Sequence, residues 1–448
     1  MARPATPTLT TIRNWLWTHP YTAAAAALFV GVAVPFLTRR ESEWRNVFVT
    51  AAEILRQGGD LYQPRNGFAY PAFMAWAALP FTYVPAPVER AAWLTVNLIC
   101  LTLLARWAWR LAGGGRLQGQ APVARGEHWA AVLGLLCGAP FLWNCMNHQQ
   151  TDIVIGALLL GGCVLLNRER SLSAAVCFGL AAAMKCTALL WAPYLLWRRR
   201  SAAAVCVAAV ALSVNLLPDL VSRAPVERTW LGEYWTHCLK GLASEDRYPG
   251  TWGSDVIYNQ SLAGSARRWL TTSWVWTADD CAVVERAGPL GGPRAARAGV
   301  YAAALVLLLG TLWAAGRPLR RLGSDAPGEV GPQGLECGAM LLLMLLLSPM
   351  SSLAHFGVLA LPGSCLGRAA VARRDGRVWA LLVAAAVLAL TANKALVGGR
   401  VYSLTLWYGS VTAETLVLLL GCCLLLWEGR KVVALMATRP ADSARRAA

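Results

Sequence analysis

The sequence has little charge for its length. Only 15% of its 448 residues are charged, whereas 56% are hydrophobic. Soluble domains carry about a quarter charged residues, so the chain is predicted to be a membrane protein. A net charge of +17 would also suit a nucleic-acid-binding protein. We expect no nucleic-acid partner, however, because the arginines lie in short loops between apolar segments, as they do in cytoplasmic loops of membrane proteins.

Several motifs of soluble enzymes are missing. The sequence has no P-loop, no GxGxxG after a strand, no HExxH and no nucleophile elbow. Its thirteen cysteines form no CxxC pair and lie mostly in apolar runs, so packing is expected there and a metal site is not. Cys238 and Cys281 would be able to pair if their loop is external, and the sequence leaves this open.

The apolar runs and arginine-rich loops predict an all-α polytopic bundle of about twelve transmembrane helices. Both termini are expected in the cytoplasm, with the first span over 21–37 and external loops over 39–90 and 222–297. Residues 1–440 are predicted to form one membrane domain, and 441–448 a disordered basic tail. Prolines interrupt 68–83, so we interpret it as re-entrant or interfacial. If it crosses instead, the topology before the large loop changes.

The first external loop carries two carboxylates, Glu41 and Glu43, where the first span meets water. An amphipathic helix follows, with Trp44, Phe48 and Leu55 on its apolar face. A carboxylate at this boundary is costly to leave unpaired and is often functional. The N-terminus of a helix also favours the ionised form that a general base needs.

Further polar residues are predicted at the external ends of other segments. Taken alone, each of these residues is explained more simply as an interface anchor or a buried hydrogen-bond partner than as part of a functional site. Their common side of the membrane favours a shared site. They include Asp60, His148, Gln149, Gln150, Asp152, Lys185, Asn259, Gln260, Arg267, Arg268 and His355.

Five strings in order resemble glycosyltransferase family 87, also known as DUF2029. They are AAEILRQGGDLY, FAYPAFMAWAALPF, HQQTDIVIGALLLGGCVLL with GLAAAMKCTALLWAPYLLWRRR, NQSLAGSARRWL, and LLLSPMSSLAHFGVLALP. The resemblance covers roughly 43–362. Within this range the sequence is similar to the polyprenol-phosphate-mannose-dependent mannosyltransferases. It implies a GT-C-like helical bundle, a polyprenyl-phosphate sugar donor, inversion, and no metal or other cofactor.

The resemblance also implies roles for individual residues. The family's acidic residue is usually Asp, so Glu43 is its nearest match and Glu41 the alternative. Donor phosphate and sugar would be bound by Lys185, His355, Asn259, Gln260, Arg267 and Arg268. Further substrate contacts are expected from Asp60, Tyr62, Tyr70, Gln149, Gln150 and Asp152.

The expected reaction moves a hexose (mannose-like) or a pentose to a hydroxyl of a glycolipid or glycan acceptor. It would take place on the non-cytoplasmic side of the inner cell membrane. A transporter or flippase of lipid-linked sugars is an alternative that needs no base. An O-antigen ligase or polymerase would instead centre on His237 and arginines of the large loop.

Overall fold

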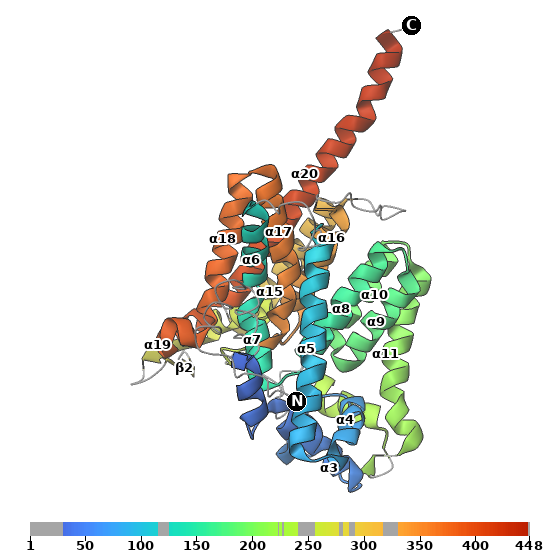
Figure 1. Cartoon of the computed structure of the whole chain (residues 1–448), viewed down its shortest axis with the longest axis vertical. Helices are drawn as coiled ribbons and strands as arrows, with labels where there is room; N and C mark the ends of the chain where they lie inside the picture. The colour runs from blue at the N-terminus through green and yellow to red at the C-terminus, as the bar shows by residue number, and fades with distance from the viewer. Residues whose placement is uncertain are drawn as a thin grey trace, which may run out of the picture.

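The computed structural model describes residues 30–114, 125–222, 224–225, 228–240, 256–276, 281–285, 292–316 and 330–446. Most of the predicted first span therefore lies outside the described residues, and its described end is helical over 30–38. Figure 1 shows a bundle of long helices, with the first external loop gathered at one end and the C-terminus at the other.

The segment 39–90, predicted to be the first external loop, folds into short helical pieces. They are η1 (Trp44–Val49), α3 (Thr50–Arg56), η2 (Pro64–Asn66), α4 (Ala72–Ala78) and η3 (Leu79–Tyr83). At about 1.5 Å per residue, α4 is far shorter than a bilayer core. Pro71 precedes it and Pro80 lies just beyond its end. This agrees with an interfacial segment rather than a span.

The predicted amphipathic helix packs as its pattern indicates. Trp44 stacks on Trp93 of α5 at 3.8 Å between ring centroids. On the polar face, Arg45 forms ion pairs with Glu53 at 2.8 Å and with Glu89 at 2.9 Å. Because Glu89 is only 1% exposed, this bridge compensates a carboxylate that would otherwise be costly to bury. The loop is thereby fixed to the start of α5.

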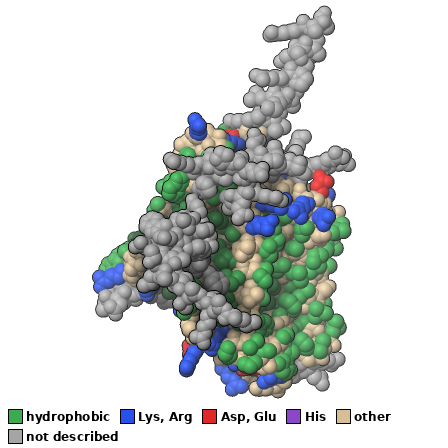
Figure 2. Space-filling view, viewed as in Figure 1, with side chains coloured by type: hydrophobic (Ala, Val, Ile, Leu, Met, Phe, Trp, Pro, Cys, Tyr) green, Lys and Arg blue, Asp and Glu red, His purple; other side chains and the backbone are tan. Residues whose placement is uncertain are grey.

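The first half of the bundle follows. It comprises α5 (Ala86–Leu111), α6 (Arg125–Leu136), α7 (Ala139–His148), α8 (Asp152–Asn167), α9 (Ser171–Met184), η4 (Cys186–Leu190), α10 (Trp191–Trp197) and α11 (Ser201–Val221). Helix α9 packs between α8 and α11. Figure 2 shows apolar side chains over the side of the bundle formed by α8 to α11. Leu172 of α9 and Val205 and Leu220 of α11 are exposed. Such a large exposed apolar face suits contact with lipid.

The large external loop contributes α12 (Trp230–Tyr234), η6 (Trp235–Leu239), α14 (Leu262–Thr271) and the strands β1 (Thr272–Trp276) and β2 (Cys281–Glu285). The strands form an antiparallel hairpin in which Thr272 pairs with Glu285 and Trp276 with Cys281. Cys238 is a buried free thiol, so the disulfide that the sequence left open is not formed.

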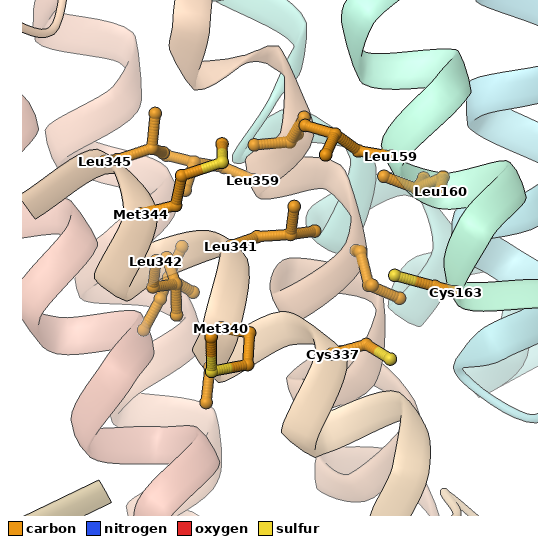
Figure 3. Packing of buried hydrophobic residues seen from close by; sticks show 14 of the residues in the cluster. Leu159, Leu160, Cys163, Cys337, Met340, Leu341, Leu342, Met344, Leu345 and Leu359 are labelled. Atoms are coloured by element: carbon orange, nitrogen blue, oxygen red, sulfur yellow. The ribbon is translucent and has the colours of Figure 1, made fainter. Parts of the chain in front are cut away.

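The second half of the bundle carries the main core. It comprises α15 (Gly292–Ala315), α16 (Pro332–Leu347), η7 (Leu353–Leu359), α17 (Ala360–Arg373), α18 (Gly376–Thr391), α19 (Lys394–Trp407) and α20 (Ser410–Arg446). Helix α16 is buried almost throughout, and Figure 3 shows its Leu341 facing Leu159 and Leu160 of α8. Helix α20 extends from Ser410 to Arg446, and the disorder predicted for 441–448 stays a prediction.

Four helices are long and apolar enough to cross a membrane in the described part of the chain: α5, α11, α15 and α20. The count rises to six if the bent pairs α6–α7 (53°) and α18–α19 (89°) each form one span. Shorter apolar helices, among them α8, α9 and α16, lie between them. The protein is therefore an all-α, multi-pass membrane protein, and the figure of twelve crossings stays a prediction.

Candidate active site

Glu43 lies in the first helical turn of the external loop, as the sequence predicts. The Ser42 hydroxyl accepts a hydrogen bond from the Arg45 backbone N–H at 3.1 Å, which begins the helix directly at the carboxylate. Tyr70 donates to Glu43 Oε1 at 3.1 Å and Gln150 donates to Glu43 Oε2 at 2.6 Å. Each carboxylate oxygen therefore has one fixed donor and retains lone pairs for a further proton.

Tyr70 is itself held by the chain around it. Its carbonyl accepts from the Tyr62 hydroxyl at 3.0 Å, and Asp60 Oδ1 accepts from the Tyr62 backbone N–H at 2.9 Å. Burial, and then the neighbouring Glu43 carboxylate, raise the pKa of the Tyr70 hydroxyl well above its usual value. The hydroxyl therefore stays protonated and remains a donor to Glu43. Asp60 and Tyr62, predicted as substrate contacts, lie behind Tyr70 as its support.

Glu43 lines a cavity of about 570 Å³, which is within the usual range for small-molecule sites. Four parts of the chain form its wall together with the first loop: α7 with the α7–α8 junction, Tyr258 of the large loop, the start of η7, and the α18–α19 junction with part of α19. The polar and aromatic lining residues are Glu43, Trp143, Asn144, Asn147, His148, Gln150, Tyr258, Ser352, Asn393, Lys394 and Tyr402. Glu41, the alternative base, is exposed and does not line this cavity.

Gln149 and Gln150 have different environments although they are neighbours. Gln149 adopts a left-handed backbone conformation (φ 56°) at the end of α7, and its side chain is buried and donates to the Phe36 carbonyl at 2.7 Å. Its own carbonyl accepts from Trp93 at 3.1 Å. Gln149 thus ties together three elements, and the turn leaves Gln150 facing the cavity and Glu43.

Asp152, Lys185 and His355 form a second cluster, as their predicted common side suggests. Lys185 Nζ lies 2.9 Å from Asp152 Oδ1, and His355 Nε2 lies 3.7 Å from the same oxygen. All three line a separate cavity of about 20 Å³, room for little more than a water molecule. His355 follows Ala354, which lines the large cavity, so the two sites are adjacent but distinct.

The NQS motif holds the loop that precedes His355, and Arg268 joins this motif to the end of α19. Asn259 Oδ1 accepts from the Ser351 backbone N–H at 3.2 Å, and the Gln260 N–H donates to the Ser351 carbonyl at 2.8 Å. The buried Arg268 guanidinium donates to the Trp407 carbonyl at 3.0 Å. None of these three lines the large cavity, and neither does Arg267. Their contacts with substrate stay a prediction.

Sequence reasoning missed Lys394, Asn393 and Tyr402 as parts of the site. The available signal was a single lysine between two apolar runs near the external surface, since charges in such positions are rarely incidental. The sequence shows an apolar span over the segment of α18 and a loop over the segment of α19, so it does not place this lysine beside Glu43. The 89° bend between them is what brings Lys394 to the cavity.

The fold and this site define a class: a multi-pass helical membrane protein with a polar cavity at the end of the bundle that holds its first external loop. The sequence model of glycosyltransferase family 87 matches residues 68–349. The chain belongs to this family, as its motifs indicated, and the protein is a membrane glycosyltransferase. Comparisons with curated proteins and with solved structures give no match, so a GT-C-like architecture stays a prediction.

Proposed function

We propose that the protein transfers a hexose or pentose from a polyprenyl-phosphate sugar to a hydroxyl of a glycolipid or glycan acceptor, with inversion and without a cofactor. The observation that carries this proposal is Glu43 itself. It lines a cavity large enough for a sugar phosphate, and Tyr70 and Gln150 hold its carboxylate in one orientation. A fixed acceptor for a proton, next to space for two substrates, is what base catalysis requires.

In the proposed step, a Glu43 oxygen takes the proton of the acceptor hydroxyl. The acceptor oxygen attacks the anomeric carbon from the face opposite the phosphate. The bond between that carbon and the phosphate oxygen breaks, and the electron pair leaves with the polyprenyl phosphate. Because this phosphate is a good leaving group, the step needs one base and no second carboxylic acid. Tyr70 and Gln150 orient the base and do not react.

The proposed side of reaction is non-cytoplasmic. The arginine-rich turns between α8 and α9 and between α10 and α11 lie at the end of the bundle opposite α3 and α4 (Figure 1). Positive charge in short loops favours the cytoplasm. This supports a C-terminus inside and a Glu43 cavity outside. Residues 1–29 lie outside the described part of the chain, so the cytoplasmic N-terminus stays a prediction.

The test uses purified protein in detergent with a panel of polyprenyl-phosphate sugars and measures the release of polyprenyl phosphate. Glu43→Gln should fold normally and lose on the order of 10²–10⁴-fold in transfer rate. Glu53→Gln is the matched control, because it removes a carboxylate from the same loop outside the cavity and should keep activity. Full activity of Glu43→Gln would remove Glu43 from the role, and loss of activity in Glu41→Gln instead would move the role to Glu41.

A further inference from the structure

The residue predicted to bind the donor phosphate, Lys185, is poorly placed for a ligand of that size. Its ammonium group is already paired with Asp152 at 2.9 Å, and the two side chains are only 15% and 7% exposed. The cavity beside them holds about 20 Å³, far less than a phosphate with a sugar attached. A donor that reached Lys185 would have to break a buried ion pair, which is costly.

The cavity that does have room offers a different cation. Four consecutive residues at the α18–α19 junction, 392–395, line the same 570 Å³ space as Glu43. Among the described residues of that lining, Lys394 carries the permanent positive charge and Glu43 the negative one. The Asn393 side chain accepts from the Ala395 backbone N–H at 3.0 Å, which fixes the chain where it bends. Lys394 is therefore presented by an ordered corner of the backbone.

The charge of the reaction gives this lysine a use. A polyprenyl-phosphate sugar is a phosphodiester with one negative charge, and the departing polyprenyl phosphate gains a second as the bond to the sugar breaks. An ammonium group beside that oxygen stabilises the transition state more than the bound donor. Lysine is also a common phosphate ligand because it is a compact point charge with three donors.

The helix that starts at Lys394 has the surface that a lipid phosphate needs. Leu396 and Val401 of α19 are 63% and 46% exposed, and α19 turns away from α18 by 89° to project at the side of the bundle (Figure 1). Leu396 therefore puts exposed apolar surface within one turn of the cation, and Gly398 (φ 77°) interrupts the helix before Val401. A polyprenyl phosphate presents the same sequence of groups, with a charged head and then an apolar chain.

We propose that Lys394 is the donor-phosphate-binding residue of the cavity, opposite in charge to Glu43, and that α19 receives the first part of the polyprenyl chain. This assignment rests on the proposed function, since it takes the donor to be a polyprenyl-phosphate sugar. It gives Lys185 a different task, which is to hold Asp152 and the base of the cavity through their ion pair.

The test measures equilibrium binding of radiolabelled decaprenyl phosphate and of decaprenol to detergent-purified full-length protein. The dissociation constant of each probe is measured for four proteins: wild type, Lys394→Ala, Lys394→Arg and Arg400→Ala. Arg400 is the matched control, because it lies on the same helix, carries the same charge and does not line the cavity. Wild type should prefer the phosphate, and Lys394→Ala should lose on the order of 10- to 100-fold in phosphate affinity. Lys394→Arg should recover part of it, and Arg400→Ala should resemble wild type.

Decaprenol binding that is equal in all four proteins would show that each variant is folded. The proposal is overturned if Lys394→Ala binds decaprenyl phosphate as wild type does, or if wild type does not distinguish the phosphate from the alcohol. It is likewise overturned if Arg400→Ala loses as much affinity, because the effect would then be one of net charge. Repeating the binding with Glu43→Gln separates the two proposals, since phosphate binding there should persist even though transfer is lost.

Discussion

The two polar sites near the end of the bundle that holds the first loop are built from similar residues but differ in what surrounds them. Glu43 has a tyrosine and an amide as neighbours and lines a cavity of about 570 Å³. Asp152 has a lysine and a histidine as neighbours and lines one of about 20 Å³. A carboxylate with neutral donors and open space can accept a proton, whereas a carboxylate paired with a cation in a closed space is stabilised as an anion. The difference supports the chemistry that we propose for the first site and a supporting role for the ion pair at the second.

The largest effect that would test this comparison is expected from Asp152→Asn. The change leaves Lys185 buried without its carboxylate, which should lower the free energy of unfolding by about 3–5 kcal/mol. The measurement is denaturation in mixed detergent micelles. Adding Lys185→Met to Asp152→Asn should restore most of the stability, because no buried charge then remains unpaired. A fully stable Asp152→Asn protein would contradict a supporting role for this pair.

The next effect is expected from Glu43→Asp, which keeps the charge and shortens the side chain by one methylene group. The carboxylate would retreat from Tyr70, from Gln150 and from the substrate. A displacement of about 1 Å in a catalytic group can cost on the order of 10²-fold in rate, so transfer should fall by that amount while thermal stability is unchanged. Equal transfer rates for wild type and Glu43→Asp would mean that the position of this carboxylate is not critical.

A smaller effect on stability is expected from Gly134→Ala, which tests the close helix packing next to the α7 wall of the large cavity. Helix α7 continues from α6, and α6 crosses α17 through small residues. A Cβ atom on Gly134 would lie 2.6 Å from Ser364 Cα, so Gly134→Ala should cost about 1–3 kcal/mol of stability through overpacking. Gly310→Ala is the control, because a Cβ there meets nothing within 4 Å. Equal denaturation midpoints for the two variants would show that this crossing can relax.

The smallest effect is expected from Tyr70→Phe, which removes one hydrogen bond to Glu43. Transfer should fall by about tenfold or less. Since the pKa of Tyr70 is raised in the folded protein, its hydroxyl contributes stability that is fully present below the unfolded pKa and is lost only as the pH rises through the folded one. The stability difference between wild type and Tyr70→Phe should therefore be constant from about pH 6 to about pH 9. A difference that shrinks within this range would contradict a buried, protonated Tyr70.

Local patterns were sufficient where the answer depended on neighbours in the sequence. The apolar face around Trp44 and Phe48 predicted a packed helix, and both side chains are buried. Prolines at both ends of α4 predicted that 68–83 would not form a regular span. The placement of Glu43 at a helix start also followed from the local sequence. These features depend on periodicity and on backbone chemistry within a few residues.

Local patterns were not sufficient for residues whose environment is set by distant segments. Asn259 and Gln260 are buried against the loop around Ser351, about ninety positions away in the sequence. Their expected contact with substrate stays a prediction. Lys185 and Lys394 look alike in the sequence, since each is a lysine at the end of an apolar run. One is closed in by Asp152, and the other lines the large cavity.

The sequence by itself determined that this is a helical membrane protein of glycosyltransferase family 87 with an acidic first loop, because composition, periodicity and short motifs are local properties. Only the tertiary structure decided which polar residues share a cavity. That depends on the bends between α6 and α7 and between α18 and α19, and on ion pairs such as Asp152–Lys185 that join distant helices. Such contacts form only once the apolar surfaces between the helices are packed.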